Sequence, residues 1–330
     1  MARHGIRFAG FGSYVPDRVL TNADLEKMVD TSDEWIVTRT GIRERHIAAD
    51  DQPTSELALN AALEALEDAR VRPEELDIIF VATFTGDFRM PNTACILQNK
   101  LGAPRAACYS VEAACTGFLY SLEAAAAMMR SSGHYRKALI VGAEKISTVV
   151  DFEDRSTCVL FGDGAGAVVL EQIDAGEDAM LASAIGADGR YADLLQVPAG
   201  GSAMPITHEV LDQGLHFLRM SGRETFRAAV NAMTDTAQQV LDEAGVAVED
   251  IRWLVAHQAN TRIIQAVGKK LGIDPANVFI NLDRYGNTSA ASIPLALNDL
   301  KREGKLTVGD LVLMVAFGGG LTFGSVLFRV

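Results

Sequence analysis

The most informative stretch of the chain is Ala113-Ala114-Cys115-Thr116-Gly117-Phe118-Leu119-Tyr120. Residues 106–110 are predicted to end a strand, and the apolar, alanine-rich run up to Met129 predicts a buried helix. Cys115 would then lie in the first turn of that helix, where unpaired backbone N–H groups and the positive end of the dipole favour a thiolate. The alternative is a small core hydrophobe, a common role of free cysteine. Cys115 is therefore a candidate nucleophile, whose role depends on what lies beside it.

Internal similarity extends this local pattern to the whole chain. Residues 66–77 align without gaps on residues 241–252, and each segment is followed by a strand and then by a helix. These helices end in matching phrases, Asn-Lys-Leu-Gly at 99–102 and Lys-Lys-Leu-Gly at 269–272. The order helix–strand–helix–strand–helix–strand is therefore predicted to occur twice.

This repeat predicts an α/β fold with two halves, 1–174 and 175–330. Alternating strands and helices indicate βαβ units and a mainly parallel sheet in each half. No linker rich in proline or serine separates the halves, so we expect one shared core. Residues 161–165 are predicted to be the glycine turn of a β-hairpin, and 175–220 to be irregular strands and loops that cap or line a site.

Three polar or glycine-rich positions lie near the ends of predicted strands. Ligands of parallel sheets bind beyond the carboxyl ends of the strands. His257 ends the apolar run 253–256, and Asn287 follows Tyr285-Gly286 near a helix start. A surface or near-core histidine and a simple helix N-cap are the respective alternatives. Residues 317–320, Phe-Gly-Gly-Gly, would let backbone N–H groups approach a ligand as in an oxyanion hole, or would only form a tight turn.

Composition excludes several classes of protein. Hydrophobic residues make up 48% and charged residues 22%, which predicts a globular chain, and the net charge of −13 argues against nucleic-acid binding. The four cysteines give neither a disulfide framework nor a paired metal-binding motif, and the glycines at 10–12 and 162–166 lack the context of a phosphate loop. We find no signal peptide and no membrane-spanning stretch, so we expect a cytoplasmic protein with no membrane association, no metal and no redox cofactor.

Taken together, Cys115, His257 in His-Gln-Ala-Asn and Asn287 in Tyr-Gly-Asn-Thr-Ser resemble the β-ketoacyl-acyl-carrier-protein synthase III family. The resemblance covers almost the whole chain, including residues 35–42, 161–166 and 317–320. It implies a thiolase-like fold of two pseudo-symmetric halves packed as α-β-α-β-α layers. Elongating synthases would carry a second histidine in place of Asn287, and thiolases a second cysteine in the terminal glycine motif. Chalcone synthases share the Cys–His–Asn set but are longer and end in a different motif.

The resemblance implies a two-stage reaction that starts fatty-acid synthesis. Cys115 would take the acyl group of an acyl-CoA primer, acetyl-CoA or another short thioester, with the N–H groups of Cys115 and Gly319 as oxyanion hole. Malonyl-acyl-carrier protein would then lose carbon dioxide, and the resulting carbanion would attack the acyl group. Neutral His257 and the Asn287 amide would donate hydrogen bonds to the thioester oxygen on which negative charge develops.

The family also suggests binding roles for further residues. Those expected to contact coenzyme A are Trp35, Arg39, Arg155, Gly222 and Asn260. Those expected to dock the acidic carrier protein are Arg227, Arg262, Lys269 and Lys270, although a solvated helix face is the alternative. The family is homodimeric, and Met90 would reach the partner's acyl pocket, where an aromatic residue is common. A flexible thioether there could admit a different or longer primer.

Other functions remain open on the sequence alone. A starter-unit condensing enzyme or acyltransferase of a polyketide or other secondary pathway would keep the same three residues. Two further alternatives are an inactive dimerisation partner, against which the intact triad argues, and a nicotinamide oxidoreductase. The sequence does not reveal the length or branching of the primer.

Overall fold

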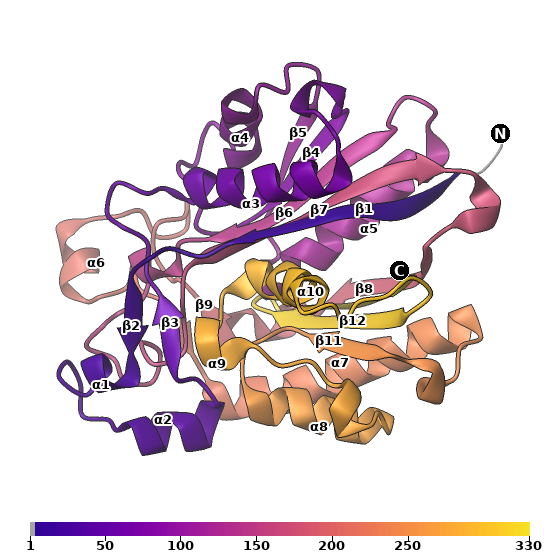
Figure 1. Cartoon of the computed structure of the whole chain (residues 1–330). Coiled ribbons are helices and arrows are strands. Elements are labelled where there is room, and N and C mark those ends of the chain that lie inside the picture. Colours follow the sequence, from indigo (N-terminus) through magenta and orange to yellow (C-terminus); the bar gives the residue numbers. More distant parts are fainter. Residues whose placement is uncertain (1–3) are drawn as a thin grey trace.

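The computed structural model describes residues 4–330, with only the backbone of Arg223. Two large sheets are separated and covered by helices, and two further sheets have two strands each, β2-β3 and β9-β10 (Figure 1). The first sheet has the strand order β1-β7-β6-β4-β5, and the second has the order β11-β12-β13-β8. The strands of the first sheet are β1 (Gly5–Tyr14), β7 (Gly164–Ile173), β6 (Lys137–Glu144), β4 (Ile78–Ala82) and β5 (Ala107–Val111). Those of the second are β11 (Trp253–Ala256), β12 (Leu311–Gly318), β13 (Thr322–Arg329) and β8 (Met180–Ala187).

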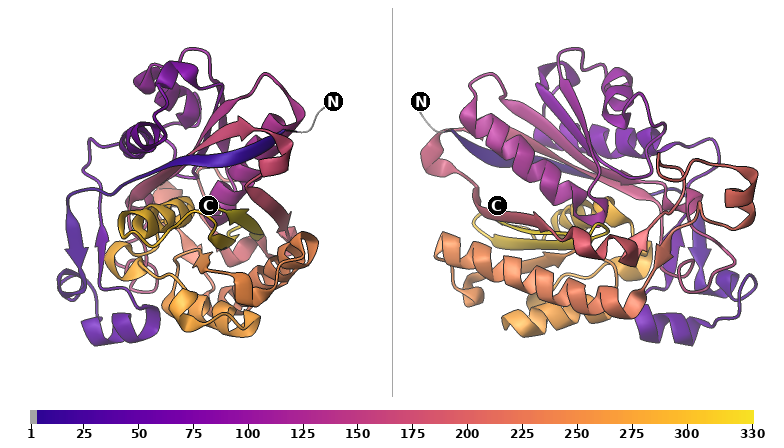
Figure 2. Two further views of the ribbon diagram at one scale, coloured as in Figure 1. Left: turned by 45° about the vertical axis from the view of Figure 1, so that its right-hand side comes forward. Right: turned by 180° about the vertical axis from the view of Figure 1, so that it is seen from behind.

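Helices form the other three layers. Figure 1 shows α3 (Thr54–Ala69) and α4 (Thr93–Leu101) over the outer face of the first sheet, and α7 (Gly222–Ala244) and α8 (Thr261–Leu271) over the second. Between the sheets lie α5 (Gly117–Ser131), which buries one face, and α10 (Ser292–Arg302), which is almost wholly buried. Figure 2, right, shows α5 and α7 from behind, one between the sheets and one outside them. The predicted α-β-α-β-α layering is confirmed.

The two sheets repeat one topology. Strands β1, β7, β6 and β4 pair in the same order and directions as β8, β13, β12 and β11. The prediction of mainly parallel sheets is only partly right. In each sheet one strand, β7 or β13, runs antiparallel to both of its neighbours, while the pairings β6–β4–β5 and β12–β11 are parallel. In the second half the counterpart of β5 shrinks to one isolated bridge between Leu254 and Val278.

Two local predictions are also corrected. The 161–165 segment is not a hairpin turn, since residues 156–160 form turns and β7 pairs with β1 and β6 instead. The 175–220 segment is irregular only in part, because β8 is a regular strand and the counterpart of β1. The glycines at 10–12 lie inside β1, as expected from their lack of phosphate-loop context.

One apolar core joins the halves. Phe118 and Leu122 of α5 pack with Ile293 and Leu297 of α10, in a cluster that also includes side chains from both sheets. Strand β7 ends at Ile173 and β8 begins at Met180, and the division at residue 174 remains a prediction.

Short elements outside the layers border the site. They are β2 (Val19–Thr21), α1 (Asn22–Leu25), α2 (Asp33–Thr40), β3 (Glu44–His46), β9 (Leu195–Gln196), α6 (His208–Asp212), β10 (Arg219–Met220) and α9 (Leu282–Tyr285). Within residues 4–330, no helix is both long enough and apolar enough to span a membrane.

Candidate active site

Cys115 lies where β5 turns into the central helix α5. A short 3-10 turn, η2 (Ala114–Thr116), makes this connection, and Ala114 adopts a φ of +46°. A residue with a Cβ is strained in this left-handed region, by about 1–3 kcal/mol, and such strain is retained where surrounding packing enforces it. The turn directs the nearly buried Cys115 side chain, 7% exposed, into an internal cavity.

An equivalent turn starts the other central helix. The 3-10 turn η8 (Ser289–Ala291) precedes α10, and Ser289 adopts a φ of +51°. The two turns contact one another between the sheets. The position that corresponds to Cys115 by this geometry is Ala290, so Asn287 lies near the equivalent helix start, as the sequence suggested, but three residues earlier.

His257 follows β11 and is held from two sides. Its backbone N–H donates to the carbonyl of Val315 (2.8 Å), and its Nδ1 lies 2.7 Å from the hydroxyl of Ser292. Because the Ser292 oxygen already accepts the N–H of Gln258 (3.3 Å), its own proton is free to be donated to Nδ1. Burial lowers the pKa of His257 to about 3. The imidazole is therefore neutral, and this arrangement leaves its Nε2–H for the cavity.

Asn287 is fixed by its backbone and its side chain. Its N–H donates to the Leu160 carbonyl (2.8 Å), and its carbonyl accepts the N–H of Gly162 (3.1 Å). Gly286 has a φ of +65°, and a Cβ there would lie 2.8 Å from the Leu160 oxygen, so glycine permits this close approach. The side-chain Oδ1 accepts the Ser289 N–H (2.9 Å), which leaves the amide NH₂ as the end available to a ligand.

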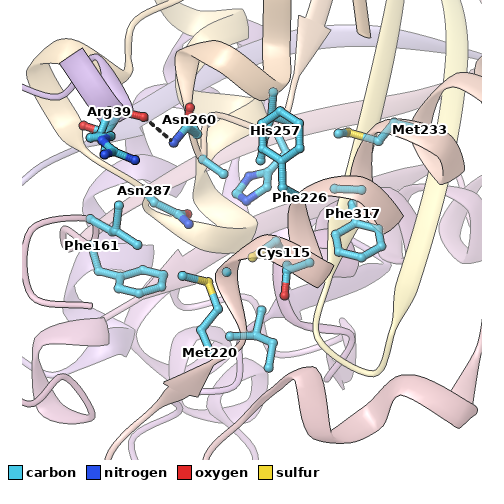
Figure 3. Close-up of a pocket in the computed structure, with 18 residues that line it drawn as sticks. Arg39, Cys115, Phe161, Met220, Phe226, Met233, His257, Asn260, Asn287 and Phe317 are labelled. Atoms are coloured by element: carbon cyan, nitrogen blue, oxygen red, sulfur yellow. Dashed lines mark hydrogen bonds between the residues drawn. The ribbon is translucent and has the colours of Figure 1, made fainter. Parts of the chain in front are cut away.

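The three side chains meet in one cavity of about 210 Å³ (Figure 3). Figure 3 shows Cys115, His257 and Asn287 around its inner end, and Arg39 and Asn260 at another side. The sequence predictions of Arg39, Gly222 and Asn260 as site residues also fall on the cavity wall. Trp35, Arg155, Met90 and Gly319 do not line it.

The buried environment changes the expected state of the nucleophile. Burial raises the pKa of the Cys115 thiol to about 12, a hydrogen bond from Ser289 lowers it, and the Glu144 carboxyl raises it further. Burial therefore opposes the thiolate that the start of the helix favours, and it favours the neutral thiol at neutral pH.

The terminal glycine motif runs directly against the nucleophile's backbone. A Cβ at Gly318 would lie 2.7 Å from the amide nitrogen of Cys115, so a larger residue could not pass there. The next residue, Gly319, follows the end of β12 and lies beside Ala114 and Leu195. The peptide units of Cys115 and Gly319 are thus near neighbours at the edge of the cavity.

Trp35 and Arg155 stand together at the surface on the side of α2. The Arg155 guanidinium carbon lies 5.5 Å from the centre of the Trp35 ring, and that of Arg39 lies 5.8 Å away. A planar base between two faces needs about 7 Å, twice a van der Waals contact. Arg155 is held in place by the Asp30 carbonyl (2.7 Å), so this pair is closed and would have to open to admit a base.

Asn260 has a structural as well as a candidate binding role. Its Oδ1 accepts the N–H of Arg262 and caps α8, and its Nδ2 donates to the Arg39 carbonyl (3.0 Å; Figure 3). The cap ties α8 to α2 beside the cavity. All four basic residues predicted for carrier docking, Arg227, Arg262, Lys269 and Lys270, are exposed on α7 and α8. Lys270 also bonds to Asn231 of α7 (3.1 Å), which links the two helices.

Sequence reasoning missed the apolar wall of the cavity. Helix α7 supplies Phe226, Ala229 and Met233, whereas Leu195 and Met220 come from the segment predicted to line a site. The one available signal was the strong amphipathic pattern of α7, which reveals a buried face but not that part of it borders a cavity.

Comparison with known proteins identifies the family. The family model described as 3-oxoacyl-[acyl-carrier-protein (ACP)] synthase III matches residues 109–189, and the model of its C-terminal part matches residues 241–330. The curated "Beta-ketoacyl-[acyl-carrier-protein] synthase III" of Desulfitobacterium hafniense (strain DSM 10664 / DCB-2) is 52% identical over 324 residues, covering 98% of this chain and 97% of the relative.

The chain belongs to the β-ketoacyl-acyl-carrier-protein synthase III family. It is a condensing acyltransferase of fatty-acid synthesis with a thiolase-like fold. The crystal structure of the synthase III from Aquifex aeolicus VF5 superposes with a TM-score of 0.91 at 48% identity, covering 99% of this chain and 100% of that one. The priming β-ketosynthase of the R1128 polyketide pathway is less similar in sequence, at 35% identity and a TM-score of 0.92, with 100% and 97% coverage.

Proposed function

We propose that this synthase III joins an acyl-CoA primer to malonyl-acyl-carrier protein through an acyl-Cys115 intermediate. The observation that carries the proposal is the convergence of a thiol, a neutral imidazole and a fixed carboxamide on one cavity. Near-identical length and high identity to synthase III enzymes support this substrate pair over others.

In the first stage Cys115 acts as the nucleophile. The thiol loses its proton, the sulfur attacks the thioester carbonyl, and coenzyme A leaves with its sulfur. The N–H groups of Cys115 and Gly319 hold the oxyanion, each such donor contributing roughly 3–4 kcal/mol to the transition state. The cavity's apolar wall excludes water from the acyl-enzyme, which favours condensation over hydrolysis.

In the second stage His257 and Asn287 act as hydrogen-bond donors. Decarboxylation of the malonyl group places negative charge on its thioester oxygen, and Nε2–H and the amide NH₂ stabilise that charge. The carbanion then forms a C–C bond to the acyl carbon, and the Cys115 sulfur departs. Neither donor titrates near neutral pH, since the pKa of His257 is about 3 and an amide has no proton to lose in this range.

Coenzyme A and the carrier protein approach over neighbouring surfaces. The nucleotide lies between Trp35 and Arg155 once that pair opens, with Arg39 near its phosphates and Gly222 and Asn260 beside the pantetheine arm. The acidic carrier protein docks on Arg227, Arg262, Lys269 and Lys270, a local basic patch on a chain of net charge −13. The reaction uses no metal or redox cofactor.

The active form in this proposal is a cytoplasmic homodimer. Met90 is 86% exposed in the single chain and does not line its cavity, which suits a side chain that enters the partner's acyl pocket. The second candidate function is priming of a polyketide, favoured by the full-length likeness to the R1128 enzyme. Turnover with the carrier proteins of fatty-acid and polyketide synthesis separates these two functions.

The deciding experiment is a panel of acyl-CoA thioesters followed by intact-mass and peptide analysis. We expect one acyl adduct per chain on Cys115, its absence in Cys115→Ser, and release of the adduct as β-ketoacyl product when malonyl-acyl-carrier protein is added. The exposed Cys95 serves as control, since Cys95→Ser should acylate normally. An adduct on another residue, or an adduct that malonyl-acyl-carrier protein does not consume, would refute the proposal.

A further inference from the structure

Glu144 is a fully buried carboxyl that the mechanism above does not use. It ends β6 of the first half, directly behind the nucleophile turn, and none of its side chain is exposed. Among the described residues no lysine, arginine or histidine forms an ion pair with it. Burial of a charged carboxyl without a cation costs free energy of folding unless hydrogen bonds or a bound proton compensate. The surroundings of Glu144 must therefore supply that compensation.

The two oxygens of Glu144 have different surroundings. Oε2 accepts the hydroxyls of Thr83 (3.0 Å) and Thr85 and the backbone N–H groups of Phe84 (3.3 Å) and Thr85 (3.2 Å). Oε1 has a weak contact with the Phe84 N–H (3.4 Å) and one hydroxyl partner, Ser289 (3.2 Å). The donors gathered on Oε2 therefore leave Oε1 as the place for a proton, facing Ser289.

Ser289 connects this carboxyl to the nucleophile. Its hydroxyl donates to Oε1 of Glu144 (3.2 Å), and its turn η8 packs against the η2 turn that carries Cys115, whose thiol pKa Ser289 lowers. Its backbone N–H holds Oδ1 of Asn287, and its strained φ of +51° fixes the turn. One residue of the second half therefore binds the Asn287 carboxamide and a carboxyl of the first half, and it lies in the turn that packs against the nucleophile turn.

We propose that Ser289 and Glu144 form a proton relay behind Cys115 that sets the protonation of the thiol. Both are positioning residues, since neither faces the cavity where substrate binds. The inference deepens the proposed function and rests on it for the role of Cys115.

The transfer is balanced within the three groups. The proton of the Sγ–H bond passes to Ser289 Oγ, while the proton of that hydroxyl passes to Glu144 Oε1. A thiol and a carboxylate become a thiolate and a carboxylic acid, and the total charge of the site is unchanged. Where Glu144 already holds a proton, it donates to Ser289, which in turn donates to the thiolate and stabilises it. When the sulfur departs from the acyl group, the same path returns the proton.

Few other titratable groups face the relay. Burial raises the pKa of Glu144 to about 8, while hydrogen bonds from Thr85 and Thr83 lower it. His257, across the cavity, does not titrate above pH 4 because its pKa is about 3. Lys145 follows Glu144, but its amine points away and bonds to the carbonyls of Ala49 and Asp50. The carboxyl of Asp163, in the 161–166 motif, accepts hydrogen bonds from the backbone N–H groups of Ala48 and Ser147 and from the Ser147 hydroxyl.

The coupling has a characteristic pH signature in the reactivity of Cys115. Below the pKa of Glu144 the thiolate population rises tenfold per pH unit. As Glu144 loses its proton, the thiol and carboxyl share one proton, and the rise flattens. We call the resulting loss of thiolate population, relative to a line of unit slope, the step. Its size reports the coupling between the two groups, about tenfold for a coupling of one pK unit.

We therefore propose to measure the alkylation rate of Cys115 by iodoacetamide between pH 6 and 10, resolved by peptide mass analysis. In a plot of the logarithm of the alkylation rate against pH, the wild type should flatten near pH 8, with a step of about tenfold or more. The rate of Glu144→Gln should rise with unit slope throughout. The rate of Ser289→Ala should show a smaller step. Glutamine keeps the shape and the acceptor oxygen but carries no titrating proton.

The matched control is Glu123→Gln, which alters another Glu–Ser pair, with Ser183, away from the cavity. It should keep the wild-type step. A wild-type profile without a step, or a step that persists unchanged in both Glu144→Gln and Ser289→Ala, overturns the relay. If Glu144→Gln does not fold, Ser289→Ala alone decides. Because iodoacetamide needs no acyl-CoA, failure of the relay is distinct from failure of the proposed function.

Discussion

At the scale of single residues, the site depends on which end of each polar group faces the cavity. Ser292 accepts from Gln258 and donates to Nδ1 of His257, and Ser289 binds Oδ1 of Asn287. The two contacts come from the first residue of α10 and from the turn η8 before it, and each leaves a donor, Nε2–H or NH₂, toward the ligand. Two donors fixed before substrate arrives suit stabilisation of a developing anion, because no reorganisation is needed at the moment of reaction.

Loss of the Asn287 donor tests this arrangement. In Asn287→Ala we expect acylation of Cys115 to proceed, while condensation slows by about 10²–10³, the usual effect of removing one such donor. Single-turnover assays that follow the acyl-enzyme and then add malonyl-acyl-carrier protein separate the two stages. Asn298→Ala is the control, since Asn298 lies further along α10 and bonds to Ser13 away from the cavity. Normal condensation in Asn287→Ala would show that its amide is not a catalytic donor.

The charge state of Glu144 also affects stability, with a definite sign. Its folded pKa of about 8 lies above the ordinary value of 4.5, so the folded state holds a proton that the unfolded chain has released between these values. The contribution of Glu144 to the free energy of unfolding therefore falls as pH rises from about 4.5 to 8.

The corresponding prediction concerns Glu144→Gln, which removes the titrating group. Denaturant unfolding at pH 5 and pH 8 should show the variant gaining stability relative to the wild type at the higher pH. Glu123→Gln again serves as control. A difference between variant and wild type that does not change with pH would mean that Glu144 titrates alike in both states.

At the scale of elements, α8 joins the cavity to the proposed docking surface. Asn260 caps its start beside the cavity, and Arg262, Lys269 and Lys270 lie exposed along it. The helix packs its apolar side, including Ile264 and Val267, into the second-half core. Its basic residues are therefore presented to solvent at a fixed distance from the nucleophile, as docking of a tethered substrate requires.

Charge reversal on this helix should weaken docking without altering chemistry. We expect Lys269→Glu to raise KM for malonyl-acyl-carrier protein about fivefold at low salt, the scale of an exposed charge pair, with a smaller effect at high salt. Acylation by acyl-CoA should be unchanged. Arg72→Glu, an exposed reversal in the first half, is the control. Equal KM values for Lys269→Glu and wild type would exclude this helix face as the docking surface.

At the scale of the whole molecule, the first sheet ends in an unpaired edge. Among the described strands β5 pairs only with β4, and its Tyr109 is 40% exposed; Phe88 and Met90, in the loop after β4, are also exposed. An exposed strand edge with apolar neighbours is a ready pairing surface, and a second copy of the chain is the partner in our proposal.

Light scattering should accordingly give twice the chain mass of 35.4 kDa. Tyr109→Glu should shift the protein to monomers and reduce condensation, because Met90 would lose the partner's pocket. Ile185→Glu, an exposed apolar residue on the other sheet's edge strand β8, should remain dimeric. A monomeric wild type with full activity would contradict the dimer.

What the sequence determined by itself is the repeat, the α/β class and three candidate residues at strand and helix ends. These follow from local periodicity and from the spacing of apolar runs, which act over neighbouring residues, whereas the layered arrangement was implied by the family resemblance. The direction of every strand was not determined, since β7 and β13 carry apolar patterns that suit either orientation, and each is inserted antiparallel between two other strands of its sheet.

Only the tertiary structure decided the electrical state of the site. Cys115 at a helix start suggests a thiolate, yet burial between two sheets makes it a neutral thiol and makes His257 a neutral donor. Ser289 and Glu144 are 145 positions apart in the chain, so the pattern of residues around either one does not predict their hydrogen bond. Desolvation and hydrogen bonding depend on distances in space, so they arise only when the two halves close on one another.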